Sequence, residues 1–256
     1  MIPWSNDRRY DIIDALHELL YNILVHGEEN TKDDSKVKEH LGNFIQITNP
    51  YPQYNENDVI FNKNQFIQDI KDGRYDLDHY GLKGEALADY VSSFSDGKII
   101  TLSGDNSFVY TYPNRLLMQK SCDEDECLAV NQIHVIVRRL RDNINTNRAV
   151  ATIYNPFLDA NESDIPCLQW LQITIRGNKM RLHCIFRSND IFGAWYSNML
   201  FLTYIALDIL EYVNSFPDGD FVKFEGIDYH CSSAHVYDVN LDSALELFKE
   251  TGIQKS

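Results

Sequence analysis

The sequence predicts an α+β fold with a single domain over residues 1–256. Three patterns indicate this fold class: helical spacing of apolar residues near the N-terminus, two strand patterns joined by a tight turn in the second half, and a long apolar segment after them. A chain of 256 residues can bury a substantial core in one domain, and neither a repeat nor a low-complexity tract divides it.

The first half of the chain predicts one clear helix and one clear strand. Apolar residues recur at helical spacing over residues 10–25, so we expect a helix there with one face buried. The charged stretch over residues 28–39 predicts a mobile loop, and residues 44–49 predict a strand that Pro50 ends. Residues 51–100 are polar and rich in Asn and Asp, and they predict no definite element.

The second half predicts more regular structure, and its clearest feature is a hairpin. Its turn is Arg-Gly-Asn-Lys, in which Gly177 and Asn178 both tolerate positive φ. Residues 198–213 are apolar on nearly all sides, which predicts a buried central helix. The expected elements are a helix over 127–143, a strand over 149–154, hairpin strands over 169–175 and 180–186, the helix over 198–213, and strands over 222–224 and 235–239.

Charge and cysteine content exclude several classes of protein. The formal net charge is −15, whereas a protein that wraps duplex nucleic acid needs clustered Lys and Arg, so we expect no nucleic-acid partner. The five cysteines form no CxxC pair, so neither a disulfide framework nor a metal site is predicted, and the acidic stretch 122–127 is expected to be a solvated loop. No apolar run is long enough for a signal peptide or a bilayer span. We therefore expect a cytoplasmic protein with no membrane partner.

Residues able to do chemistry stand at the ends of the expected elements. Cys167 precedes the first hairpin strand, and Arg-Ser-Asn-Asp (187–190) ends the second. Asn198 opens the buried helix, and His-Val-Tyr (235–237) lies on a late strand. Each has an ordinary explanation alone, since a Cys is often a small core residue and an Asn often caps a helix. Together, a thiol, a guanidinium, a carboxylate, an amide and a His/Tyr pair suggest a polar pocket around a nucleotide.

The order and spacing of these residues resemble the core of the thymidylate synthase and pyrimidine nucleotide hydroxymethylase superfamily. The shared order is Pro-Cys, a hairpin, Arg-Ser-x-Asp, an Asn eight residues after the Asp, and His-x-Tyr. Residues 147–155 resemble the family's Arg-Arg strand with its Trp-Asn end, and residues 110–115 resemble its Tyr-Gly-x-x-Trp-Arg segment. The resemblance runs from about residue 110 to residue 237. It implies a large mixed β-sheet packed with helices and a homodimer formed through the sheet.

The resemblance implies covalent catalysis on a pyrimidine nucleoside monophosphate, with 5,10-methylenetetrahydrofolate as the one-carbon donor. Cys167 would add to C6 of the ring as a thiolate, which makes C5 nucleophilic. Arg187 would grip the 5′-phosphate and stabilise that thiolate. Tyr110 would sit beside the ring and assist proton removal at C5, and Asp190 would bind the pterin of the folate.

The resemblance also implies which further residues bind the two small molecules. Ser188 would add a hydrogen bond to the phosphate, and Arg148 would reach the phosphate held by the neighbouring subunit. His235 and Tyr237 would bind the sugar 3′-hydroxyl. Trp195 would either line the core or stack on the pterin.

Asn198 indicates which base is bound. An amide offers both a donor and an acceptor, which match O4 and N3–H of uracil. In the phage hydroxymethylases that act on dCMP the corresponding residue is Asp, which suits the cytosine amino group and N3. Asn therefore favours dUMP, and the alternative is that Asn198 only caps the following helix.

Three departures from the family pattern lie in the expected site. Leu168 stands where the synthases have a His after the nucleophile. The family's Glu has no counterpart in residues 66–73, where Asp69 is the nearest substitute. The N-terminal phosphate-binding Arg is also missing, and the basic residues of that stretch are Lys32, Lys36 and Lys38. A lysine can bind phosphate as a point charge but cannot copy the fork of an arginine.

A fourth departure concerns the product. Both reactions of the superfamily pass through an exocyclic methylene group at C5, to which hydride gives a methyl group and water a hydroxymethyl group. Synthases end in a short apolar tail that excludes water, whereas residues 251–256 are polar, which favours water. Residues 187–190 also resemble the phage hydroxymethylases, so we expect hydroxymethylation of dUMP. The alternatives are a divergent thymidylate synthase that methylates dUMP, a dCMP or CMP hydroxymethylase, and a catalytically silent nucleotide-binding homologue.

Overall fold

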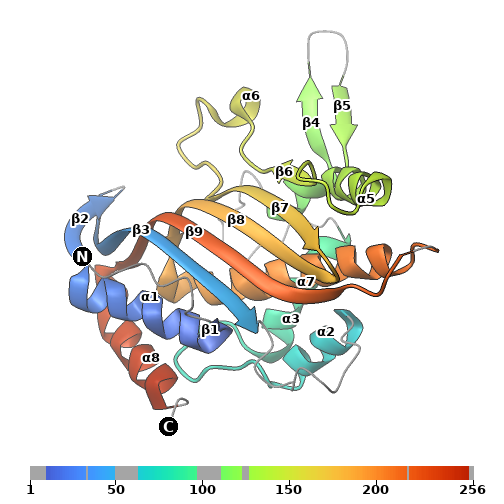
Figure 1. Cartoon of the computed structure of the whole chain (residues 1–256). Helices are drawn as coiled ribbons and strands as arrows, with labels where there is room; N and C mark the ends of the chain where they lie inside the picture. The colour runs from blue at the N-terminus through green and yellow to red at the C-terminus, as the bar shows by residue number, and fades with distance from the viewer. Residues whose placement is uncertain are drawn as a thin grey trace.

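The centre of the molecule is a mixed β-sheet (Figure 1). A computed structural model describes residues 10–32, 34–49, 63–96, 111–122, 127–217 and 219–253. Within these ranges the sheet has seven strands in the order β1-β3-β9-β8-β7-β6, with β2 also paired to β3. The pairs β1/β3 and β8/β9 are parallel and the others antiparallel. The strands are β1 (Tyr10–Asp11), β2 (Glu28–Lys32), β3 (Ser35–Asn49), β6 (Val150–Thr152), β7 (Leu168–Arg176), β8 (Lys179–Asp190) and β9 (Lys223–Tyr237).

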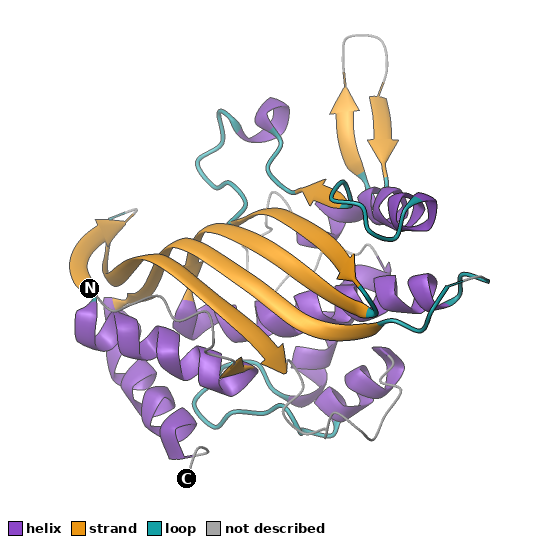
Figure 2. Ribbon diagram, viewed as in Figure 1, coloured by secondary structure: helices purple, strands orange, loops and turns teal. Residues whose placement is uncertain are grey.

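Helices cover one face of this sheet (Figure 2). Helix α1 packs on β3 and β9, and α7 packs on β8 and β9, while α8 lies against α1 and α3 against α7. A small hairpin of β4 (Gln119–Cys122) and β5 (Cys127–Val130) stands apart from the main sheet. The α+β prediction is confirmed. The helices are α1 (Ile12–His26), α2 (Lys63–Lys71), α3 (Gly84–Asp96), α4 (Tyr112–Leu117), α5 (Gln132–Asp142), α6 (Pro156–Asp159), α7 (Tyr196–Asn214) and α8 (Leu241–Ile253), with a π-helical turn at Ile191–Trp195 and a 3-10 turn at Asp238–Asn240.

Local sequence explains the first helix and the main hairpin. The side chain of Asp11 caps α1 by accepting a hydrogen bond from the Asp14 amide at 2.7 Å, and the apolar stripe that predicted this helix is buried. The strands predicted over 169–175 and 180–186 are β7 and the first part of β8. Gly177 takes a positive φ of 59°, whereas Asn178 does not, so a single glycine meets the need of the turn.

The buried central helix is confirmed as α7. Fifteen of its nineteen residues are buried, which matches a segment that is apolar on nearly all sides. Its neighbour β9 was predicted as two short strands, over 222–224 and 235–239, but it is one strand of fifteen residues. The two predictions missed its middle because residues 225–233 carry polar groups on the sheet face that no described helix covers.

Two other sequence predictions were wrong in part. Residues 28–39 do not form a loop, because β2 and the start of β3 pair there as an antiparallel hairpin. Its charged side chains are typical of an edge strand, where they discourage pairing with another chain. The helix predicted over 127–143 begins only at Gln132, since Cys127–Val130 pairs with β4. The polar stretch 51–100 contains α2 and α3, while residues 51–62 and 97–100 lie outside the described ranges.

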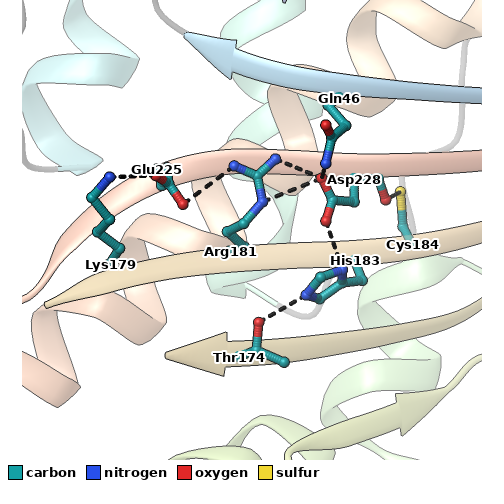
Figure 3. Close-up of polar contacts among 8 residues, drawn as sticks. All are labelled: Gln46, Thr174, Lys179, Arg181, His183, Cys184, Glu225 and Asp228. Carbon is teal, nitrogen blue, oxygen red and sulfur yellow. Dashed lines mark hydrogen bonds and ion pairs between the residues drawn. The ribbon is translucent and has the colours of Figure 1, made fainter. Parts of the chain in front are cut away.

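A polar network lies on the sheet face opposite the helices (Figure 3). Asp228 accepts hydrogen bonds from Arg181 at 2.5 Å and from His183 at 2.9 Å, and Gln46 adds a third at 3.2 Å. His183 also contacts Thr174 at 2.8 Å, so the network joins four strands, β3, β7, β8 and β9. Burial opposes ionisation of Asp228, but the hydrogen bonds from His183 and Arg181 outweigh it and hold the pKa of Asp228 well below its usual range.

A buried ion pair fixes the segment that leads towards the site. Arg115 of α4 bonds to Asp159 of α6, and their side chains are 8% and 2% exposed. Asp159 also accepts the backbone N–H of Asn155 at 2.7 Å. We expect Arg115→Met to reduce the free energy of unfolding by about 3–5 kcal/mol, because it leaves a buried carboxylate without its cation. Urea denaturation measures this, and Lys249→Met, which removes an exposed pair with Glu246, should change it by less than about 0.5 kcal/mol.

Candidate active site

Five of the predicted site residues lie where β8 and β9 end beside the β2–β3 hairpin: Cys167, Arg187, Ser188, Asp190 and His235. Cys167 immediately precedes β7, whose first residue pairs with Phe186 of β8. The parallel pairing of β8 and β9 then places Asp190 opposite His235. Because the two strands run in the same direction, residues near their C-terminal ends lie side by side.

Three groups meet at the hydroxyl of Ser188. The sulfur of Cys167 lies 3.6 Å from Ser188 Oγ, Arg187 Nη1 lies 3.2 Å from it, and Lys32 Nζ lies 3.3 Å from it. A hydroxyl has one donor hydrogen and two acceptor lone pairs, and the two cations can only donate. Their hydrogen bonds fill the acceptor positions, so the remaining O–H of Ser188 is directed at the sulfur.

Arg187 also holds the loop that carries the cysteine. Its Nε donates to the carbonyl of Pro166 at 3.1 Å and its Nη2 to the carbonyl of Ile165 at 2.6 Å. Its own backbone N–H donates to the carbonyl of Cys167 at 2.9 Å. With the bond to Ser188, the side chain uses three of its five N–H groups, which leaves two for an anion.

Lys32 is one of the three lysines in the stretch where the family's N-terminal Arg is missing, and the sequence did not distinguish it from Lys36 and Lys38. It ends β2, and besides Ser188 it reaches His235 Nε2 at 3.2 Å. Lysine only donates, so this nitrogen of His235 accepts and the imidazole is neutral. Burial, followed by the charge of Lys32, lowers the pKa of His235 to about 4, which agrees with a neutral ring near pH 7. Within the described ranges neither Lys32 nor Arg187 has a carboxylate at ion-pair distance.

Among the three cysteines whose side chains the structure describes, Cys167 is the accessible one. It is half-buried, whereas Cys184 and Cys231 are buried. Burial raises the pKa of Cys231 to about 11 and that of Cys184 well above its usual value. A thiolate is the nucleophilic form of cysteine, so neither buried thiol suits that role. Cys122 and Cys127 face one another across the β4–β5 hairpin, and their side chains lie outside the described set.

Asp190 is held in place by the turn that follows it. Its Oδ1 accepts the backbone N–H of Gly193 at 3.0 Å, and burial raises its pKa. A Cβ on Gly193 would lie 2.4 Å from Asp190 Oδ2, so any larger residue there would displace this carboxylate. Trp195 ends the same turn but is 0% exposed and packs edge-on against Tyr229, 5.9 Å between ring centres. Its ring offers no surface to a pterin, and it belongs to the core instead.

Asn198 lies in the first turn of α7 and is 4% exposed. The N-cap position of that helix is Trp195, so Asn198 is not its capping residue and that alternative is wrong. The hydroxyl of Tyr90, on α3, donates to Asn198 Oδ1 at 2.6 Å. This partner could not be predicted from the sequence, because Tyr90 lies in the stretch 51–100, which predicted no definite element.

The remaining predicted residues are placed less closely. Tyr237 lies edge-on to His235, with ring centres 5.3 Å apart. The side chain of Arg148 is exposed. Tyr110 lies outside the described residues. Asp69 is buried and bonded to Gln65 and Arg74, which gives it a structural role in α2.

Comparison with known proteins decides the family. The protein-family model for thymidylate synthase matches residues 15–253 of this chain. The chain belongs to the thymidylate synthase family. It is therefore an enzyme of the thymidylate synthase superfamily, a group of transferases in nucleotide biosynthesis, and the predicted α+β fold with a mixed sheet is that of the family.

Relatives in this family align along nearly the whole chain. A protein of Methanothermobacter thermautotrophicus is 28% identical over 240 residues, which cover 93% of this chain and 96% of the relative. A protein of Methanocaldococcus jannaschii is 28% identical and covers 95% and 96%. Both carry the name "Putative thymidylate synthase". The alignment thus extends over the first hundred residues, where the family's motifs could not be read from the sequence.

Proposed function

We propose that this enzyme transfers a one-carbon unit from 5,10-methylenetetrahydrofolate to C5 of dUMP, with Cys167 as the covalent nucleophile. The observation that carries the proposal is the meeting of the Cys167 sulfur, Arg187 and Lys32 at one hydroxyl, that of Ser188. This arrangement joins a nucleophile to a doubly cationic anchor, and a nucleoside monophosphate has a reactive ring at one end and a phosphate at the other.

The phosphate would lie between Arg187 and Lys32. Two cations around one neutral oxygen repel each other, and an anion between them removes that repulsion. Arg187 has two further N–H groups to offer, and charge-assisted hydrogen bonds of this kind are the strong ones. Lys32 would thus bind the phosphate in place of the N-terminal arginine that other family members have and this chain lacks.

The ring would lie over Cys167, with Asn198 at its edge. The Ser188 hydroxyl, aimed at the sulfur, would stabilise the thiolate that adds to C6. His235, neutral and nearly buried, would receive the sugar hydroxyl together with Tyr237. The nucleotide would be held at two places, by its phosphate and by the edge of its ring. These two anchors would fix the position of C6 next to the sulfur of Cys167.

The residues near Asp190 fit a folate. A carboxylate has about four lone-pair positions, and the backbone N–H groups of Gly193 and Phe192 occupy two of them. The others could accept N–H groups of a pterin. When bound, the folate supplies the one-carbon unit, and in a synthase it also supplies the hydride. Trp195 has no part in this site.

For the final step we propose that water completes the reaction and gives 5-hydroxymethyl-dUMP. Residues 187–190 match the Arg-Ser-Asn-Asp pattern of the hydroxymethylases, and Leu168 replaces the synthase His. Methylation is a second candidate, which the names of the methanogen relatives favour. Incubation with dUMP and methylenetetrahydrofolate separates them: hydroxymethyl-dUMP with tetrahydrofolate supports water addition, whereas dTMP with dihydrofolate contradicts it. Parallel assays with dCMP and CMP test the base and sugar.

Lys32→Met should weaken dUMP binding about 10- to 100-fold, since a hydrogen bond to a charged group contributes about 1.5–3 kcal/mol. Binding of deoxyuridine, which lacks the phosphate, should change less than about twofold. Isothermal titration with both ligands measures the difference. Lys36→Met removes the same charge from an exposed position on the same hairpin and should leave dUMP binding intact. Equal losses for dUMP and deoxyuridine would show that Lys32 does not bind the phosphate.

We further propose a homodimer formed through the sheet face that carries the Asp228 network. This face lies opposite the helices (Figure 3). Asp228, which joins the network, is only 7% exposed. A second copy there would let the exposed Arg148 contribute to the neighbouring phosphate site. Sedimentation should give twice the chain mass, and a monomer that is fully active would contradict the proposal. Among the described helices none is long and apolar enough to cross a membrane; the cytoplasmic location stays a prediction.

A further inference from the structure

The carboxamide of Asn198 already has a protein partner on its oxygen. Tyr90 Oη lies 2.6 Å from Asn198 Oδ1. That separation fits a hydroxyl donating to a carbonyl oxygen, since O–H···O bonds centre near 2.7–2.8 Å and N–H···O bonds near 2.9–3.0 Å. The bond therefore distinguishes the two ends of the amide, with the oxygen towards Tyr90.

Tyr90 is itself held by a row of aromatic rings. Its ring packs at 6.2 Å on Phe201 of α7, and Phe201 packs at 6.2 Å on Tyr112 of α4. The hydroxyl of Tyr112 accepts the backbone N–H of Leu168 at 3.3 Å, next to the nucleophile. The row thus runs from Asn198 to the Cys167 loop, so the Tyr90 hydroxyl has a fixed position relative to both.

The orientation of this amide matters because the two pyrimidines present opposite edges. Uracil offers O4 as an acceptor and N3–H as a donor, whereas cytosine offers an amino donor at C4 and an acceptor at N3. An asparagine pairs with uracil through Nδ2–H to O4 and Oδ1 to N3–H. Pairing with cytosine needs the same amide turned over by 180°, which exchanges the positions of its oxygen and nitrogen.

We propose that Tyr90 is a positioning residue that fixes the Asn198 carboxamide in the orientation that accepts a uracil ring and thereby disfavours cytosine. The inference rests on the proposed nucleotide-binding function and adds the source of its base selectivity. The carbonyl oxygen has two lone pairs, so it can accept from Tyr90 and from N3–H together. Turning the amide over would replace a hydroxyl-to-carbonyl bond by a weaker amide-to-phenol contact.

Tyr90→Phe removes the hydroxyl and keeps the ring, so the aromatic row remains. We expect the ratio of kcat/KM for dUMP to that for dCMP to fall about five- to tenfold, which corresponds to one neutral hydrogen bond of about 1 kcal/mol. Tyr196→Phe is the matched control, since its hydroxyl donates at 2.9 Å to a backbone carbonyl, that of Tyr75, in the core. That variant should lower stability without changing the ratio.

Asn198→Asp provides the decisive background. A carboxylate has two equal oxygens, so Tyr90 has no orientation left to set, and Tyr90→Phe should leave the dUMP/dCMP ratio of the Asn198→Asp enzyme unchanged. Equal losses for dUMP and dCMP in the Tyr90→Phe single variant would overturn the inference and make Tyr90 a purely structural residue. The inference would also be overturned if Tyr90→Phe changed the dUMP/dCMP ratio as much in the Asn198→Asp background as in the wild type. If the wild-type enzyme bound neither nucleotide, the proposed function itself would be wrong.

Discussion

Cys167→Ala should reduce turnover of dUMP by at least about 10⁴-fold while the Kd for dUMP changes less than about threefold. Removal of a covalent nucleophile eliminates the reaction path itself, and such substitutions have the largest kinetic effects in enzymes. Binding should persist because the phosphate contacts proposed for Arg187 and Lys32 and the ring contact proposed for Asn198 do not involve the sulfur. Steady-state assays and isothermal titration measure the two quantities separately.

The control for this variant is another cysteine of the same sheet. Cys184 is buried on β8, where its pKa is raised well above the usual value by burial. Cys184→Ala should lower stability but keep kcat within about threefold of the wild type. If Cys167→Ala retained wild-type turnover, the thiol would not be the nucleophile.

Arg187→Lys should lower kcat/KM for dUMP about 10²- to 10³-fold although the positive charge is kept. Arg187 bonds at once to the carbonyls of Ile165 and Pro166 and to the Ser188 hydroxyl, and a single ammonium group cannot span those acceptors. The loop that holds the nucleophile would then move, and small displacements of reacting groups have large kinetic costs. The phosphate would lose a planar, bidentate partner as well.

Reactivity of the thiol without substrate separates these two contributions. Alkylation of Cys167 by iodoacetamide, followed on its own peptide by mass spectrometry, should slow in Arg187→Lys because the Ser188 and loop contacts change. It should not slow in Lys32→Met to the same degree if Lys32 acts mainly on the phosphate. Arg176→Lys, at the exposed end of β7, is the matched control. It should change neither kcat/KM for dUMP nor the rate of Cys167 alkylation. An unaltered kcat/KM in Arg187→Lys would remove this residue from the catalytic machinery.

Residues at strand ends could be identified from the sequence, because strand patterns also fix where strands stop. The sequence places Cys167, Arg187, Ser188 and Asp190 beside predicted strands and His235 on one, and the structure brings Cys167, Arg187 and Ser188 into direct contact. The parallel pairing of β8 with β9, which unites Asp190 and His235, was not readable from either strand alone. It depends on how a chain of about thirty intervening residues crosses the helical face.

The sequence could neither distinguish Lys32 from Lys36 and Lys38 nor indicate Tyr90, for different physical reasons. The charged run around Lys32 has the composition of a solvated loop, and only its pairing with β3 turns that lysine towards Ser188. Tyr90 lies on an amphipathic helix inside a polar stretch, and its bond to Asn198 exists only because α3 packs on α7. For Trp195 the sequence suggested a contact that the structure does not have. Its proximity to Asp190 in the sequence suggested a contact with the ligand, but its large apolar ring is buried in the core.

The most direct measurement uses 5-fluoro-dUMP with methylenetetrahydrofolate. The reaction of dUMP releases product only after C5 loses its proton, and 5-fluoro-dUMP carries fluorine at that position, which cannot be removed by a base. An enzyme that attacks C6 should therefore accumulate the adduct instead of releasing product. Mass spectrometry of the digested protein should find the nucleotide on the peptide that contains Cys167, in the wild type and in Cys184→Ala but not in Cys167→Ala. Normal turnover of dUMP without an adduct on Cys167, or with the adduct on another residue, would contradict the covalent role of this sulfur.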